Sequence, residues 1–211
     1  DLTIVTCRNE GSMEDRIIPH LLGYDDVSIL ESNLDYLGID LVVLKDSRLP
    51  WRNTFKFEMI RNYLNSGKCV TEYFMCCDAI DVIFQDDPQT VIDIFESSDC
   101  DCLFMSTHSL DGYSCMPEVK RFVDEINGNN GRYLNSGIYI GKTSFVKELF
   151  DEAIKYAIPH GVIMADYTEY LSRKPADYPK GSQDQDIFRY IEPKFYPRMK
   201  VDYQNLMAYR S

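Results

Sequence analysis

Two carboxylates three residues apart, Asp78 and Asp81, form the most distinctive candidate site in this sequence. They follow the apolar run Tyr73–Cys77, which is typical of a buried strand in an α/β sheet. The carboxyl ends of such strands open into the crevice where these sheets bind ligands. Hard divalent cations prefer oxygen ligands and often bridge carboxylates to phosphates. The pair therefore indicates Mn²⁺ or Mg²⁺ acting on a phosphorylated or nucleotide-linked substrate, although an Asp-rich turn with no metal is the alternative.

Three further segments carry polar groups that could act on the same substrate. Asn135 and Ser136 lie in the sequence Leu-Asn-Ser-Gly, where a strand would meet the crevice. Asp184 and Gln185 place a carboxylate and an amide at the start of an expected helix. Lys56 belongs to the most basic stretch near the proposed site, and it could neutralise a phosphate. Each group also has a plain structural explanation, as a turn residue, a helix cap or an exposed helix charge.

Composition and charge limit the class of protein. The chain of 211 residues is long enough for one domain, and we expect residues 1–211 to form a single domain cut from a longer chain. The net charge of −12 argues against a nucleic-acid partner, but an acidic site can still hold a diphosphate through a cation. We expect no transmembrane segment, reduced cysteines among the seven present, and a cytoplasmic location.

The order of the elements predicts the fold class. Apolar runs at 2–6, 39–44, 73–77, 103–105 and 138–140 predict strands. Helical spacing or capping residues predict helices over 27–37, 53–66 and 143–157, and helices that begin near residues 87 and 184. Segments 108–132 and 159–182 are expected to be loops that set specificity. This alternation predicts a mostly parallel α/β sheet with helices on both faces.

Taken together, these motifs resemble a GT-A-type glycosyltransferase, and in particular the glycosyltransferase domain of the collagen lysyl hydroxylase family. Asp78 and Asp81 match the two carboxylates of that family's D-x-x-D-V-I motif. The Leu-Asn-Ser-Gly sequence at 134–137 matches its following strand, and Asp184-Gln185 matches its acidic segment. The compact length also resembles the N-terminal glycosyltransferase domain of a chlorovirus protein that helps to build capsid glycans, which would place the protein in the host cytoplasm.

The resemblance implies a function and a role for each residue. It implies a metal-dependent, retaining transferase that moves a sugar from a UDP-sugar donor to a glycan or protein-linked hydroxyl acceptor. Asp78 and Asp81 would hold the metal ion, and Asp184 would face the sugar and the acceptor hydroxyl. The remaining residues implied to bind the donor are Thr6, Cys7, Arg8, Lys56, Ala79, Asn135, Ser136 and Gln185.

Two positions depart from the family pattern. Ile80 stands where the family has a tyrosine inside the motif. The family's third metal ligand is a histidine after the last strand, but the corresponding stretch Val201–Gln204 contains none. Asp202, solvent or a residue beyond Ser211 would have to complete the metal coordination.

Two other function classes remain open from the sequence. A phosphatase or phosphotransferase with an aspartate nucleophile would carry D-x-D just after the first strand, where this chain has Thr6-Cys7-Arg8. A non-catalytic domain that binds a nucleotide sugar or serves as a scaffold would show no turnover. Nucleotide binding that depends on Mn²⁺, followed by sugar transfer, separates the transferase from both.

Overall fold

The computed structural model describes residues 1–9, 27–47, 53–110, 113, 116–157 and 184–208. In this part of the chain, one six-stranded sheet has the order β2-β1-β3-β5-β4-β6. β5 is antiparallel to both of its neighbours and the other pairs are parallel, so the sheet is mostly parallel, as predicted. The strands are β1 (Leu2–Asn9), β2 (Val42–Asp46), β3 (Tyr73–Cys77), β4 (Cys102–Thr107), β5 (Tyr133–Lys142) and β6 (Met199–Val201).

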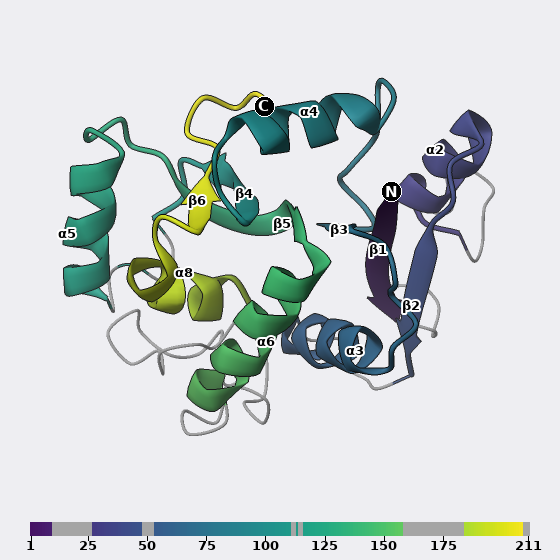
Figure 1. Ribbon diagram of the computed structural model, residues 1–211, viewed down its shortest axis with the longest axis horizontal. Helices are drawn as coiled ribbons and strands as arrows, with labels where there is room; N and C mark the ends of the chain where they lie inside the picture. Colours follow the sequence, from purple (N-terminus) through teal and green to yellow (C-terminus); the bar gives the residue numbers. More distant parts are fainter. Residues whose placement is uncertain (10–26, 48–52, 111–112, 114–115, 158–183, 209–211) are drawn as a thin grey trace.

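Helices cover both faces of the sheet (Figure 1). One face packs against α3 (Asn53–Asn65), α6 (Thr143–Ala157) and α8 (Asp184–Phe195). The other face packs against α2 (Ile29–Leu37) and α4 (Gln89–Ser97). α5 (Pro117–Ile126) contacts α8 at the end of the sheet away from α2 (Figure 1). The predicted α/β class is therefore confirmed.

The central strand β3 shows why its sequence is apolar without alternation. Phe74 and Cys76 point into the core beneath α3, α6 and α8. Met75 and Cys77 point into the core beneath α2 and α4. Because successive side chains of a strand face opposite sides, a strand covered on both faces needs apolar residues at every position. The chain then leaves the sheet directly into Asp78.

α2 illustrates how local sequence fixes a helix on one side of the sheet. Ser28 is the N-cap, and it forms a reciprocal capping box with Glu31. Gly38 ends the helix with φ +69°, a left-handed conformation that glycine adopts without steric cost. The predicted end of the helix at Gly38 is confirmed, whereas the exposed Val27 lies before the cap.

Three expectations about the elements need correction. β2 spans Val42–Asp46 and not 39–44, because the Ile39 amide caps α2 by donating to the Leu34 carbonyl. β5 extends over Tyr133–Lys142 and includes the Leu-Asn-Ser-Gly sequence, so the predicted strand at 138–140 was too short. Segment 108–132 was expected to be a loop, but it contains α5, which has a proline in its first turn. The expected loop at 159–182 lies outside the described residues.

Six cysteines lie in the described part of the chain, and all are free thiols. Burial raises the pKa of Cys76 to about 12 and raises the pKa values of Cys7 and Cys77 well above the ordinary value. These thiols are therefore protonated at neutral pH. None of the described helices combines the length and the apolar character needed to cross a membrane. The cytoplasmic location stays a prediction.

Glu192 is a buried carboxyl group on α8, with an exposed fraction of 1%. Its oxygens accept hydrogen bonds from the hydroxyl groups of Tyr113 at 3.4 Å and Tyr203 at 3.3 Å. Burial raises the pKa of Glu192 from 4.5 to about 7, although the two tyrosines and the nearby Arg189 favour the charged form. The folded state therefore holds a proton on Glu192 at pH values where the unfolded state has lost it.

This proton gives a prediction for stability. Between about pH 4.5 and about pH 7 the folded chain binds one more proton at Glu192, so the free energy of unfolding falls as pH rises through this window. We expect the wild type to lose about 3 kcal/mol over this range relative to Glu192→Gln, which cannot titrate. Urea unfolding of both proteins at several pH values measures the difference. Parallel pH profiles for the two proteins would contradict the buried, protonated state.

Candidate functional site

One ammonium group connects two carboxylates from distant parts of the sequence. The Nζ atom of Lys56 on α3 lies 2.7 Å from Oδ1 of Asp78, the first residue after β3. The same Nζ lies 3.2 Å from Oδ2 of Asp184, the first residue of α8. The structure therefore brings together three residues from three different elements, all of which the sequence analysis selected.

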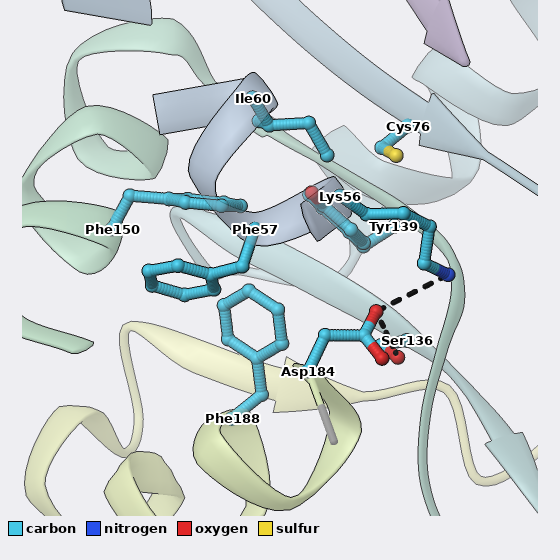
Figure 2. Close-up of a pocket in the computed structure, with 9 residues that line it drawn as sticks. All are labelled: Lys56, Phe57, Ile60, Cys76, Ser136, Tyr139, Phe150, Asp184 and Phe188. Carbon is cyan, nitrogen blue, oxygen red and sulfur yellow. Dashed lines mark hydrogen bonds and ion pairs between the residues drawn. The ribbon is translucent and has the colours of Figure 1, made fainter. Parts of the chain in front are cut away.

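Aromatic rings surround one side of this cluster. Figure 2 shows the Lys56 ammonium and the Ser136 hydroxyl both directed at the Asp184 carboxylate, beside Phe57 and Phe188. A pocket at this point is also lined by Phe150, whose ring stacks on Phe57 at 4.7 Å between centroids. Apolar walls reduce the local screening of charge, so the ion pairs here are stronger than pairs in water.

Burial and charge set the protonation of the cluster. Burial opposes the charge on Lys56, but Asp184 and Asp78 outweigh it and raise the pKa of Lys56 well above its ordinary value. Burial also raises the pKa of Asp184, and the charge of Asp78 adds to this rise while Lys56 opposes it. The ammonium lies closer to Asp78 than to Asp184, so it compensates the more buried carboxylate less fully. Lys56 is therefore a permanent cation at this site.

The first turn of α8 is joined directly to β5. The Ser136 hydroxyl donates to Oδ2 of Asp184 at 3.2 Å, and the Ser136 amide donates to Oε1 of Gln185 at 3.3 Å. Met105 pairs with Asn135, whereas Phe104 pairs with Tyr139, four residues further along β5. The β4–β5 pairing therefore changes register at this point. This bulge leaves residues 136–138 without partners on β4 and turns the Ser136 groups toward α8.

Gly137 gives the Asp78 carboxylate its space. The Asp78 amide donates to the Gly137 carbonyl at 2.8 Å, so the two backbones lie side by side. A Cβ atom at position 137 would lie 2.9 Å from Oδ2 of Asp78 and 2.9 Å from Oδ1 of Asn135. Asn135 in turn accepts a hydrogen bond from the Gly137 amide at 2.7 Å. Only glycine therefore leaves both side-chain oxygens where they are.

The second carboxylate of the motif is arranged differently from the first. Asp81 is exposed, and no hydrogen bond or ion pair joins it to another described residue. Asp78 has one oxygen on Lys56, and its side chain is one-third exposed. Two carboxylates in one short stretch fit the oxygen preference of Mn²⁺ or Mg²⁺, and both retain access to solvent.

A third protein ligand is not found within the described ranges. They contain no group of three or more His, Cys, Asp or Glu side chains placed to hold a metal ion. Asp202 was a candidate for the third metal ligand in the sequence analysis. It is buried after β6, and its Oδ2 accepts a hydrogen bond from the Met207 amide at 2.7 Å. Asp202 therefore closes a local turn, and solvent or substrate oxygens would supply the remaining ligands of a metal.

The predicted donor-binding residues at the end of β1 have side chains engaged within the fold. Thr6 is buried and donates to the Cys77 carbonyl at 2.8 Å. Cys7 lies in the core beneath α3. Arg8 pairs with Glu31 on α2, with Nε 2.9 Å from Oε2. Cys7 is nevertheless close enough to the Lys56 cluster to feel the charges of Lys56, Asp78 and Asp184. The role of all three residues in donor binding stays a prediction.

Ala79 acts through its backbone, and sequence reasoning missed two further residues, Gly137 and Arg189. Ala79 is buried, and its carbonyl accepts the Leu30 amide at 3.1 Å, which ties α2 to the turn between the two aspartates. Gly137 was noted only as part of a motif, because its effect depends on a contact with Asp78 across two strands. Arg189, which is fully buried on α8, gave no signal except an arginine within an apolar helix face.

Comparison with known proteins gives a family match. A family model described as the PLOD GT domain, the lysyl hydroxylase glycosyltransferase domain, matches residues 45–156. A solved structure of a glycosyltransferase involved in the glycosylation of the major capsid of PBCV-1 is similar, with 13% identity and a TM-score of 0.49 over 95% of this chain and 81% of that chain. The 4-diphosphocytidyl-2C-methyl-D-erythritol synthase of Anaerococcus prevotii shows 9% identity and a TM-score of 0.40, over 94% of this chain and 87% of that chain. No curated protein matches the sequence.

Removal of the shared ammonium should destabilise the fold. Lys56→Met leaves two carboxylates together without their cation, and we expect the free energy of unfolding to fall by about 3–5 kcal/mol. Arg61→Met is the matched control, because Arg61 lies on the same helix and pairs with Asp151 at the surface. That change should cost about 0–1 kcal/mol. Equal losses in urea unfolding of the two variants would show that the Lys56 pairs contribute no more than a surface pair.

Proposed function

The chain belongs to the PLOD GT domain family of glycosyltransferases, and on this basis we propose that it moves a sugar from a UDP-sugar donor to a hydroxyl group of a glycan or glycoprotein acceptor. We further propose retention of the anomeric configuration. The observation that carries the proposal is the cluster of Lys56 with Asp78 and Asp184 at the carboxyl end of β3, next to Asn135 and Ser136. Ligands of open α/β sheets bind at such strand ends.

Asp78 and Asp81 are the residues that would hold Mn²⁺ or Mg²⁺. When bound, such an ion neutralises the diphosphate of the departing nucleotide. The charges of the chain favour this role, because the carboxylates of Asp78, Asp81 and Asp184 outnumber the single ammonium of Lys56. Without a further cation, this acidic group would repel a diphosphate.

Lys56 and Asp184 are the residues proposed to act on the reacting groups. Lys56 keeps its charge, and a phosphate oxygen that replaces Asp78 as its partner would be stabilised by it. Asp184 would face the donor sugar and the acceptor hydroxyl. Lys56 and Ser136 fix the orientation of its carboxylate, so little reorganisation is needed when a substrate binds.

The remaining proposed contacts surround the donor. Asn135, Ser136 and Gln185 would contact the sugar from β5 and the first turn of α8. Thr6, Cys7, Arg8 and Ala79 would contact the base or ribose. Because Thr6, Cys7 and Ala79 are buried, their contribution would come mainly from backbone groups and from the shape of the loop.

Nucleotide binding tests the donor and the metal together. We expect UDP with Mn²⁺ to raise the melting temperature, whereas UDP alone, and GDP or CDP with Mn²⁺, should have little effect. Ligand at about 100 times its Kd stabilises a protein by about 2.7 kcal/mol, which a thermal-shift titration detects. Asp81→Asn should abolish the shift, and Asp86→Asn, which makes the same charge change in the same loop, should keep it. A shift that survives in Asp81→Asn would exclude this residue as a metal ligand.

Gly137 provides a steric test of the same site. Gly137→Ala places a Cβ atom against Asp78, so we expect the shift caused by UDP with Mn²⁺ to disappear even where the variant folds. Gly141→Ala is the control, because position 141 of the same strand is also crowded, by the Asp101 carbonyl and Val146, but does not touch Asp78. An unchanged ligand-induced shift in Gly137→Ala would show that the position of Asp78 is not critical for binding.

A further inference from the structure

Arg189 holds a charged group entirely inside the fold, with an exposed fraction of 0%. Its Nε donates to the Leu134 carbonyl on β5 at 3.0 Å. A terminal amino group donates to the Ser109 carbonyl, beyond the end of β4, at 3.2 Å. The guanidinium also lies 4.5 Å from the ring centroid of Tyr113. One side chain thus joins α8 to two parts of the chain that are distant in sequence, β5 and the stretch that contains Ser109 and Tyr113.

α8 contacts β5 on both sides of Asn135, where the bulge begins. Arg189 holds the carbonyl of Leu134, and the first turn of the helix holds Ser136 through Asp184 and Gln185. Five residues separate Asp184 from Arg189, a rise of roughly 7.5 Å along a helix, and two residues of a strand span roughly 6.6 Å. The spacing of the two attachment points along α8 therefore matches their spacing along β5. Two points fix both the position and the rotation of the helix, whereas one point would leave rotation free.

Stability alone does not explain an arginine at this place. Replacing buried ionic groups with apolar residues of similar size is often neutral or stabilising. The chain nevertheless keeps Arg189 with Glu192 one turn further along the same buried face. The planar guanidinium has donors in a fixed fork, so it can bind two backbone carbonyls at once and hold them at a set separation.

We propose that Arg189 is a positioning residue that holds the first turn of α8 on β5 and thereby aims Asp184 at the reacting groups. This inference rests on the proposed function, because Asp184 is the group that it positions. Arg189 acts through Leu134 and Ser109 on the bulged part of the sheet, and it touches no substrate. Its loss leaves the metal-binding aspartates and Lys56 in place but frees the helix end that carries Asp184 and Gln185.

Arg189→Met tests the proposal with two readouts. Hydrogen exchange of the Ser136 amide reports the contact with Gln185, and we expect it to speed up by at least about tenfold, because opening of this contact is then local. For sugar transfer we expect kcat to fall by about 10- to 100-fold, because misplacement of a catalytic group by about 1 Å has an effect of this size. The KM for the UDP-sugar should stay within about threefold of wild type. Arg189→Lys keeps the charge but not the fork, and it should show the same pattern if the Met variant does not fold.

The matched control is Ile92→Ala, which weakens the core on the opposite face of the sheet. It should lower the melting temperature without faster exchange at Ser136 and without loss of kcat. The proposal would be overturned if the Arg189 variants had the same Ser136 exchange rate and the same kcat as Ile92→Ala. If wild type transfers sugar from no UDP-sugar, the proposed function fails, and the Ser136 exchange rate alone then decides whether Arg189 holds α8 on β5.

Discussion

The sharing of one lysine ammonium between two carboxylates is the interaction on which this site depends. Asp78 follows the central strand and Asp184 opens the last helix, and like charges so close together would repel each other without a cation. Lys56 supplies that cation from a third element, and two of the three side chains are largely buried. The site therefore exists only when α3, β3 and α8 are assembled around one nitrogen atom.

The rest of the fold serves this convergence. A sheet that is covered on both faces brings the end of β3 to a crevice, and β5, which is antiparallel to β3, lies next to it. The bulge in β5 leaves the Ser136 amide and hydroxyl available for α8, and Gly137 provides the space for Asp78. The departure of β5 from regular pairing with β4 thus lies beside the Lys56 cluster, where the proposed ligand would bind.

Sequence reasoning found the features that depend on short patterns. The apolar run before Asp78 predicted a strand covered on both faces, and helical spacing followed by Gly38 predicted the end of α2. The same reasoning selected Lys56, Asp78 and Asp184, which the structure then brought together.

Features that depend on long-range contacts were not predictable in this way. The length of β5 and its bulge depend on pairing with β3 and β4, and the ion pair of Arg8 with Glu31 depends on where α2 packs. The importance of Arg189 depends on carbonyl groups more than fifty residues away. No local pattern encodes such contacts, because they arise only when separate elements pack against each other.

Asp78 and Asp81 are the residues proposed to hold a cation that joins the acidic site to a nucleotide diphosphate. The most direct test is the crystal structure of the protein with UDP and Mn²⁺, with diffraction data collected at the manganese absorption edge. We expect one anomalous peak that contacts carboxylate oxygens of both Asp78 and Asp81 and the diphosphate of UDP. Bound UDP with no anomalous peak at these aspartates would contradict this proposal.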